Sequence, residues 1–388
     1  MRIGIFSESY EPVLNGVTVS ILTLTKELKR LGHHIWVFAP GYRGHKDIEN
    51  RVFRFPSLRT YKARDYPLAI PYLPRLPERV KDLDLDIIHT HTPFMLGWLG
   101  LRLAKRLNIP IISTNHTWYT EYAHYFPLSP TAVTRSFIVR MLRRYYNQCD
   151  GVVVPSSPIA ELLRGYGVHT PMHVIPTGNS LDTGRDSEAR SRIRAECSIP
   201  ADARVLLYVG RLAREKNLEL LFEAFERLAR KHGDVYLLVV GGGPYEAACR
   251  SAASKLQSGE RIAFTGHLPR ELVAKYYSAG DLFAFPSTTE TQGLVLAEAL
   301  GAGIPCVAVN AGGSPEMLAD GEDSLLTEDD ADDFTEKIDR LLTDRELMER
   351  FSARAVESSS RFSPYEMALR TLDAYESVRV QKRGAEAG

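Results

Sequence analysis

Short apolar runs alternate with helical periodicity along the first half of the chain. Residues 2–6 form an apolar run that predicts a buried strand, and apolar positions then recur at helical spacing from Val17 to Leu31, where Gly32 ends the predicted helix. Further runs predict strands at 34–38, 86–90, 109–114, 151–155 and 173–176. Because strands alternate with helices, this half is predicted to form a parallel, doubly wound sheet.

The second half repeats the same pattern. Apolar runs predict strands at 205–210, 235–240, 261–265, 281–285 and 305–309, with a helix over 218–229. Beyond Asp330 the spacing is helical throughout, over 334–342, 345–358 and 364–380. A polar stretch, 177–203, separates the halves. We therefore predict a domain over 1–180, a second over 181–362, and a helix and tail over 363–388.

Composition narrows the class of protein. The chain has 388 residues, of which 44% are hydrophobic, and no apolar run approaches the length of a membrane-spanning helix. The first residues already form a predicted strand and lack the regions of a signal peptide. Four cysteines are scattered without Cys-x2-Cys spacing. This pattern favours a reducing, cytoplasmic compartment and argues against a zinc site or a disulfide scaffold.

The zero net charge conceals an asymmetry. Residues 1–180 contain 22 lysines and arginines against 13 acidic residues, and the remainder contains 26 against 35. A basic half could face nucleic acid or an anionic membrane, or the two halves could simply attract each other. No helix-turn-helix or base-stacking motif accompanies the basic half, so a nucleic-acid partner is not predicted.

Two glutamates eight residues apart, Glu290 and Glu298, flank the predicted start of a helix. They follow the predicted strand 281–285, and Gly293 between them permits a ligand to approach the backbone closely. A strand, a polar loop, a glycine and a helix N-terminus together suit anions and hydroxyl groups. The pair is equally compatible with one loop glutamate and one surface glutamate, so the spacing alone leaves both interpretations open.

Two cations, Arg211 and Lys216, lie between the strand 205–210 and the helix 218–229. They could bind a phosphate at the helix N-terminus, or they could be solvated surface charges. The absence of Gly-x4-Gly-Lys-Ser/Thr excludes a P-loop NTPase, and no Gly-x-Gly-x-x-Gly follows the first strand. The cluster Gly241–Gly243 favours a tight turn that a ligand can approach.

Histidines gather near the ends of predicted strands in the first half, at His89, His91, His116 and His124. The His-x-His spacing occurs in metal sites, but no acidic cluster accompanies it, and a metal site is not predicted. A histidine at the carboxyl end of a strand is placed to make polar contacts or to move a proton. A core histidine satisfied by the backbone is the alternative for His89 or His91.

Two segments suggest a membrane surface. Residues 131–147 combine apolar positions with arginines and predict a basic amphipathic helix. The stretch 61–75 is aromatic, basic and rich in proline, and predicts a loop. Such segments can lie against anionic headgroups, where each cation contributes about 1 kcal/mol. The alternative is a helix that packs on the sheet and exposes a solvated basic face.

Taken in order, the motifs of this chain resemble those of retaining glycosyltransferases of the glycosyltransferase 4 group, which includes bacterial lipid and sucrose-type enzymes. The motifs are Pro12–Val17, His116, Gly210–Arg211 with Lys216, Gly241–Pro244, Glu290-x7-Glu298, Glu298–Pro305 and Gly312–Glu316. The resemblance covers nearly the whole chain, and only the linker 176–182 departs from the group's pattern. It implies an α/β fold of the GT-B class, with two doubly wound Rossmann-like domains facing a central cleft and C-terminal helices crossing back to the first domain.

The resemblance also implies roles for residues. Arg211 and Lys216 would neutralise the diphosphate of a nucleotide sugar, and His116 would contact the transferred sugar. Glu290 would hold sugar hydroxyls and Glu298 ribose hydroxyls. The implied catalytic residues are His116, Arg211, Lys216 and Glu290. The implied donor-binding residues are Gly16, Gly210, Arg211, Lys216, Gly242, Glu290, Thr291, Gln292, Gly293, Leu294 and Glu298. No metal or other cofactor would be required, because the two cations serve the phosphates.

Within the group, Thr289–Gly293 and Asn115–Tyr125 look most like bacterial diacylglycerol glucosyltransferases. This likeness implies a UDP-glucose donor, a diacylglycerol acceptor, and a location on the cytoplasmic face of an anionic membrane. The implied acceptor and membrane residues are Tyr122, His124, Arg135, Arg140, Arg143 and Arg144. Alternatives are a GDP-mannose or UDP-GlcNAc donor, a phospholipid or soluble acceptor, and a non-catalytic binding protein with the same fold.

Overall fold

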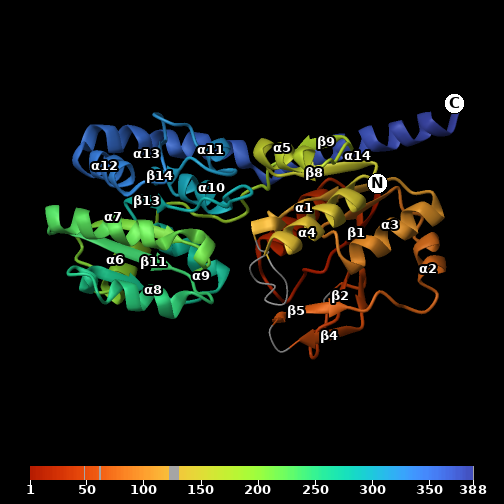
Figure 1. Cartoon of the computed structure of the whole chain (residues 1–388), viewed down its shortest axis with the longest axis horizontal. Coiled ribbons are helices and arrows are strands. Elements are labelled where there is room, and N and C mark those ends of the chain that lie inside the picture. Colours follow the sequence, from red (N-terminus) through yellow and green to blue (C-terminus); the bar gives the residue numbers. More distant parts are fainter. Residues whose placement is uncertain (48, 61–62, 122–130, 388) are drawn as a thin grey trace. The chain divides into compact units, whose positions relative to one another are not determined.

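The computed structural model describes residues 1–47, 49–60, 63–121 and 131–387, which form two compact units (Figure 1). Unit 1 comprises Met1–Gly178 together with Pro364–Gly388, and unit 2 comprises Asn179–Ser363. The chain therefore passes between the units twice, after Gly178 and after Ser363.

Unit 1 is built on a seven-stranded parallel sheet with the order β3-β2-β1-β6-β7-β8-β9. Its strands are β1 (Arg2–Phe6), β2 (His34–Pro40), β3 (Val52–Phe55), β6 (Ile87–Thr90), β7 (Ile111–Thr114), β8 (Gly151–Val154) and β9 (Met172–Val174). All residues of β6, β7 and β8 are buried. Strands covered on both faces are rich in apolar residues, and each of these three contains an apolar pair or run that the sequence pattern located.

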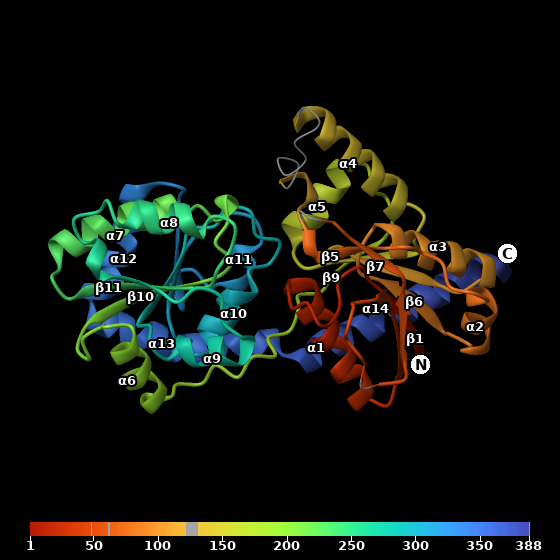
Figure 2. The same cartoon turned by 90° about the horizontal axis from the view of Figure 1, so that it is seen from below.

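Helices cover both faces of this sheet (Figure 2). The helices of unit 1 are α1 (Gly16–Arg30), α2 (Leu76–Asp82), α3 (Met95–Leu107), α4 (Thr131–Tyr146), α5 (Ser157–Gly165) and α14 (Pro364–Ala387). Side chains alternate along a strand, so Ile3 and Ile5 pack with α1 and α14, whereas Phe6 packs with α3, α4 and α5. Tyr375 and Val378 of α14 are fully buried in the first of these layers.

One part of unit 1 differs from the sequence prediction. The described part of the stretch 61–75 is not only a loop, because β5 (Ala63–Ala69) pairs with β4 (Ser57–Thr60) in an antiparallel hairpin. Pro67 lies within β5 and indicated a loop, but a strand with a single partner tolerates proline because one of its edges needs no hydrogen bonds. The predicted tail after residue 380 is also helical, since α14 continues to Ala387.

Unit 2 contains a six-stranded parallel sheet with the order β12-β11-β10-β13-β14-β15. Its strands are β10 (Arg204–Val209), β11 (Val235–Val240), β12 (Ile262–Phe264), β13 (Leu282–Phe285), β14 (Cys306–Val309) and β15 (Ser324–Thr327). Its helices are α6 (Ser187–Glu196), α7 (Leu218–Lys231), α8 (Glu246–Ala253), α9 (Arg270–Tyr277), α10 (Leu294–Gly301), α11 (Ser314–Met317), α12 (Ala331–Thr343) and α13 (Arg345–Ser359). Figure 2 shows α7 and α8 on one side of the sheet and α6, α9 and α13 on the other.

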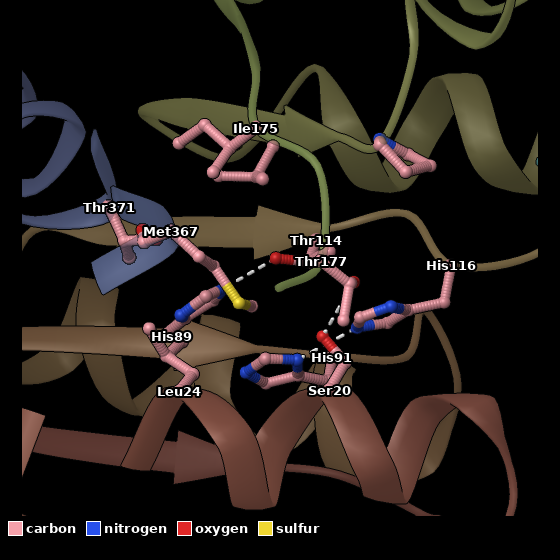
Figure 3. A pocket seen from close by; sticks show the side chains of 12 residues that line it. Ser20, Leu24, His89, His91, Thr114, His116, Ile175, Thr177, Met367 and Thr371 are labelled. Atoms are coloured by element: carbon pink, nitrogen blue, oxygen red, sulfur yellow. Dashed lines mark hydrogen bonds between the residues drawn. The ribbon is translucent and has the colours of Figure 1, made fainter. Parts of the chain in front are cut away.

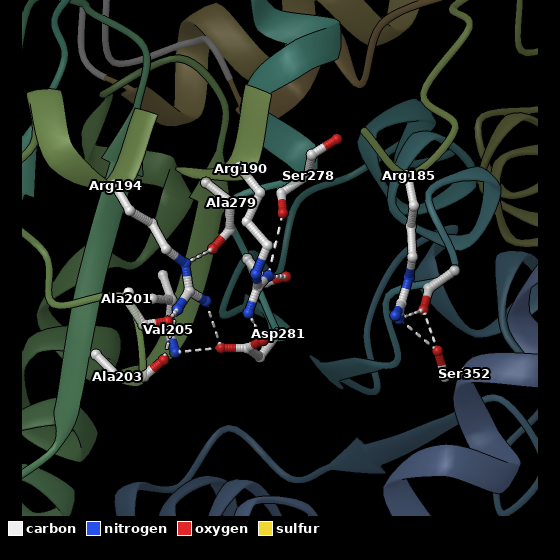
Figure 4. A network of polar contacts seen from close by, with 12 residues as sticks. Arg185, Arg190, Arg194, Ala201, Ala203, Val205, Ser278, Ala279, Asp281 and Ser352 are labelled. Carbon is white, nitrogen blue, oxygen red and sulfur yellow. Dashed lines mark hydrogen bonds and ion pairs between the residues drawn. The ribbon is translucent and has the colours of Figure 1, made fainter. Parts of the chain in front are cut away.

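An ion-pair network, of which Arg194 is the buried member, ties α6 to the sheet of unit 2 (Figure 4). Asp281, just before β13, accepts hydrogen bonds from Arg190 at 2.5 Å and from Arg194 at 2.8 Å. The Arg194 side chain is only 2% exposed, and its remaining donors bond the carbonyl oxygens of Ala201, Ala203 and Ala279. Burial lowers the pKa of Arg194, and the Asp281 carboxylate opposes that shift. Hydrogen bonds therefore engage all three nitrogens of this guanidinium where desolvation penalises its charge.

Each unit is thus a doubly wound α/β layer structure, as the sequence pattern predicted. In such a sheet, loops at the carboxyl ends of neighbouring strands meet at one edge, and these loops carry most of the residues that the sequence singled out.

Candidate functional site

In unit 2, glycines bring the loops after β10 and β11 into contact. Gly241 has φ +130, and a Cβ there would lie 2.1 Å from the carbonyl oxygen of Gly210. A Cβ on Gly243 would lie 2.2 Å from the carbonyl oxygen of Leu212. The amide of Leu212 also donates to the carbonyl oxygen of Gly242 at 3.0 Å. This glycine cluster is therefore required by backbone packing, as the interpretation of a tight turn anticipated.

The loops after β13 and β14 meet in the same way. The amide of Gly313 donates to the carbonyl oxygen of Glu290 at 2.8 Å. A Cβ on Gly312 would lie 2.4 Å from that same oxygen, and one on Gly313 would lie 2.3 Å from the carbonyl oxygen of Thr291. The backbone that carries Glu290 is thus held by two glycines that follow a different strand.

The structure joins two of the predicted donor residues directly. The ammonium group of Lys216, which ends the short 3-10 helix Arg214–Lys216, donates to Oε1 of Glu290. Their side chains are only 14% and 16% exposed. Arg211 instead pairs with Glu215, four residues away. A cation and a carboxylate side by side at the carboxyl ends of the strands can bind a ligand that carries both an anionic group and hydroxyl groups.

The carboxylate of Glu298 contacts two other side chains of unit 2. Its side chain is buried on α10, where Oε2 accepts a hydrogen bond from the Tyr277 hydroxyl at 2.7 Å and Oε1 lies 3.1 Å from Nη2 of Arg270. Burial raises the pKa of the carboxyl, and Arg270 and Tyr277 act in the opposite direction. Neither partner was found from the sequence, and α9, which carries both, had no motif to mark it.

The remaining predicted donor residues lie along the same edge of unit 2, except one. Gly293 has φ +87 and precedes α10, whose first residue is Leu294, and Gln292 is buried beside it. Thr291 is half-buried, and Gly210 and Gly242 lie in the paired loops described above. Gly16 belongs to unit 1, where it begins α1 after the capping residue Asn15. Among the described residues, a Cβ on Gly16 would meet no atom within 4 Å.

In unit 1 the structure brings three histidines together (Figure 3). His91 Nδ1 lies 2.9 Å from His116 Nε2. His89 is bonded by side chains rather than by the backbone, with Nδ1 2.7 Å from the Tyr375 hydroxyl and Nε2 2.6 Å from Thr114 Oγ1. Burial lowers the pKa of His89 to about 3 and that of His116 to about 4, and lowers the pKa of His91 as well. All three rings are therefore neutral near pH 7.

A buried glutamate lies nearby and was not found from the sequence. Glu8 comes two residues after β1, and its carboxyl group bonds the Leu96 amide at the start of α3 and the Thr92 hydroxyl. The Glu8 amide also donates to Thr92 Oγ1 at 3.2 Å. Burial raises the pKa of the Glu8 carboxyl to about 7, although the Leu96 and Gly97 amides oppose that shift. Its position just after the first strand, at the carboxyl end of the sheet, was the only sequence feature that could have marked Glu8 as a candidate site residue.

The predicted amphipathic helix is present as α4. Its inner face buries Ile138, Leu142 and both tyrosines at its end, and the four predicted arginines, Arg135, Arg140, Arg143 and Arg144, are exposed. Two large apolar side chains on α4 are also exposed, Val133 at 59% and Phe137 at 67%. The spacing of Val133, Phe137, Arg140 and Arg144 places them on one stripe of the helix. Tyr122 and His124 lie outside the described residues.

Two kinds of feature are absent from the part of the chain that the structure describes. No group of three His, Cys, Asp or Glu side chains in this part of the chain is arranged to hold a metal ion. No helix within the same residues combines the length and the apolar character needed to cross a membrane.

Comparisons with known proteins match most of the chain. The family model described as Glycosyltransferase Family 4 matches residues 14–183, and the model described as Glycosyl transferases group 1 matches residues 189–358. The chain is 34% identical over 313 residues to the alpha-monoglucosyldiacylglycerol synthase of Streptococcus pneumoniae, covering 79% of this chain and 71% of that protein. It is 31% identical over 346 residues to the GDP-mannose-dependent alpha-mannosyltransferase of Corynebacterium glutamicum, covering 87% of this chain and 79% of that protein. The solved sucrose-phosphate synthase from Thermosynechococcus elongatus has a TM-score of 0.77 at 25% identity, covering 98% of this chain and 99% of that one.

Proposed function

Because the chain belongs to glycosyltransferase family 4 and is a hexosyltransferase, we propose that it transfers glucose from UDP-glucose to diacylglycerol or a related membrane lipid, with retention of configuration. The family and the GT-B fold class, both predicted from the sequence motifs, are confirmed. The donor, the acceptor and the roles of individual residues are the proposal.

In this proposal unit 2 binds the donor. Lys216 and Arg211 would each exchange their carboxylate partner for the diphosphate, which leaves Glu290 free to accept hydrogen bonds from sugar hydroxyls. Fixed cations next to a departing diphosphate stabilise the charge that develops as the glycosidic bond breaks. The acceptor oxygen then bonds the anomeric carbon on the same face, and a phosphate oxygen of the leaving group takes its proton. Arg211 and Lys216 would make a metal unnecessary, and activity should therefore persist in EDTA.

The observation that best supports a lipid acceptor is the stripe of exposed apolar and basic side chains on α4. Val133 and Phe137 expose apolar surface directly beside Arg140 and Arg144 on one side of the helix. An interfacial helix inserts such apolar side chains between headgroups while its arginines attract anionic lipids. The similarity to the pneumococcal alpha-monoglucosyldiacylglycerol synthase supports the same class of acceptor.

A panel of donors and acceptors tests the reaction. The enzyme would be incubated with UDP-glucose, UDP-GlcNAc or GDP-mannose and with vesicles that contain diacylglycerol, and release of nucleoside diphosphate would be measured. We expect release that requires both UDP-glucose and diacylglycerol. A preference for GDP-mannose would instead indicate a mannosyltransferase, as the corynebacterial relative is named. If none of the lipid acceptors in the panel gave release of nucleoside diphosphate, the proposal would be contradicted.

A matched pair of substitutions tests the membrane surface. Val133 on α4 and Val380 on α14 are both 59% exposed. Val133→Asp should weaken flotation with anionic vesicles several-fold, because each apolar side chain withdrawn from water contributes about 1 kcal/mol or more. Val380→Asp adds the same charge and should leave flotation unchanged. Equal flotation of both variants and the wild type would rule out α4 as the membrane-binding element.

A further inference from the structure

The histidine network of unit 1 arises from strand geometry. His89 lies in β6 and His91 directly follows that strand, where its amide still bonds the carbonyl oxygen of Phe6 in β1, so both side chains leave the face of the sheet that α1 and α14 cover. Their ring centroids lie 4.1 Å apart. His116 follows β7, the next strand of the sheet, and stacks on His91 with a centroid distance of 5.1 Å. The three rings thus form one contiguous row (Figure 3).

The hydrogen bond between His91 and His116 selects tautomers. Both rings are neutral near pH 7, because burial holds each pKa below its usual value. A neutral imidazole has one donor nitrogen and one acceptor nitrogen. The 2.9 Å bond between Nδ1 of His91 and Nε2 of His116 therefore fixes opposite roles for these two atoms. The tautomer that His91 adopts decides which nitrogen of His116 carries the proton.

The other edge of His91 faces a hollow. Its Nε2 is buried and has no hydrogen-bond partner among the described residues. It borders a cavity of about 10 Å³ lined also by Ser20 and Thr177, whose hydroxyl groups lie 3.1 Å apart. That volume is at the lower limit of what one water molecule needs, and His91, Ser20 and Thr177 place polar groups in a lining that is otherwise largely apolar. The hollow is far too small for a sugar.

We propose that His91 is a positioning residue for His116, which it holds in one tautomer and one orientation through Nδ1, while Nε2 is satisfied by a single water in the hollow. This inference rests on the proposed function, in which His116 contacts the transferred sugar. Both nitrogens of His89 are hydrogen-bonded to other side chains, Tyr375 and Thr114. His91 is therefore the ring through which this histidine network contacts His116.

Position and tautomer matter because the ring must present the correct nitrogen to the sugar. A side chain just after a strand samples more rotamers when it loses a hydrogen-bonded and stacked neighbour. Misplacement of a group near the reacting centre by a fraction of an ångström lowers kcat without a matching change in the affinity for a donor that other residues hold.

The experiment compares His91→Phe and His91→Asn with a matched control. Asparagine can still supply a hydrogen bond near the place of Nδ1, whereas phenylalanine keeps only the ring. His173, on β9 of the same sheet, also has a buried Nε2 without a partner among the described residues, so His173→Phe is the control. We expect His91→Phe to lower kcat about tenfold or more with donor KM changed less than about twofold. His91→Asn should recover part of that loss, and His173→Phe should match the wild type.

A second measurement does not depend on turnover. Proteins labelled with ¹⁵N-histidine report the protonation of each ring nitrogen by NMR, and His116 is assigned from the signal that His116→Gln removes. We expect one fixed tautomer for His116 in the wild type and a mixture in His91→Phe. An unchanged tautomer together with unchanged kcat in His91→Phe would overturn the proposal. If His116→Gln itself left turnover intact, the role of His116 in the proposed function would fail, while the NMR result would still decide whether His91 orients it.

Discussion

The buried carboxyl group of Glu8 should make unit 1 less stable as the pH rises. In the folded protein burial raises its pKa to about 7, from an ordinary value of 4.5. Below both values the carboxyl is protonated in the folded and the unfolded chain, and it has no effect on pH dependence. Between them the unfolded chain loses the proton while the folded chain keeps it. Stability is therefore lost as the pH rises through this window.

The size of the effect follows from the shift. A displacement from 4.5 to about 7 corresponds to a penalty of about 1 kcal/mol near pH 5 and about 3 kcal/mol near pH 8. Glu8→Gln removes the ionisable group but keeps an oxygen for the Leu96 amide and an amide group for Thr92 Oγ1. The variant should therefore gain about 2 kcal/mol relative to the wild type between these two pH values.

The three tryptophans make the measurement specific to unit 1. Trp36, Trp98 and Trp118 all lie in Met1–Gly178, so tryptophan fluorescence during urea unfolding follows that unit and not unit 2. Titration of the buried histidines is common to both proteins and cancels in the difference. Glu78→Gln, on an exposed position of α2, serves as the control and should show the wild-type pH dependence. A difference between Glu8→Gln and the wild type that stays constant from acid to alkaline pH would refute the reasoning.

Two further predictions concern unit 2. Asp281→Asn leaves the buried guanidinium of Arg194 without its counter-charge, and the calorimetric transition of unit 2 should lose about 3–5 kcal/mol. Retention of that transition at its wild-type temperature would contradict this. Gly312→Ala places a Cβ 2.4 Å from the carbonyl oxygen of Glu290 at a residue with φ +57, and should therefore displace the Glu290 loop. Thermal stabilisation by the nucleotide-sugar donor should fall while the melting temperature without donor changes by only a few degrees.

Most strands of both sheets could be predicted, including β9 and β12 at the sheet edges, whereas β3, β15 and the hairpin strands β4 and β5 could not. The runs at β8 and β13 contain no polar side chain, because helices cover both sides of the sheet. By contrast β3 and β15 are equally short but include Arg54 in the first and Ser324 and Thr327 in the second, so neither forms a continuous apolar run. The hairpin strand β5 contains a proline, which favoured a loop.

The candidate site shows the same division. The sequence pattern assigned Lys216 and Glu290 to the ends of different strands. Only the fold reveals that these two residues, 74 positions apart in the chain, form an ion pair. Glycines at these loops carried a signal, because close backbone approach leaves few other residues possible. The partners of Glu298 carried none, since Arg270 and Tyr277 resemble any arginine and tyrosine on an amphipathic helix.

The placement of α14 has a consequence for synthesis of the chain. Residues 1–178 leave the ribosome first, yet the face of their sheet that contains Ile3 and Ile5 is completed only when Tyr375 and Val378 emerge. About 200 residues separate the two events, which at typical translation rates is about 10–40 s. During that interval unit 2, whose chain is continuous, can finish folding, while the older unit still exposes apolar surface. The nascent N-terminal unit is therefore the part of this enzyme that most needs a chaperone.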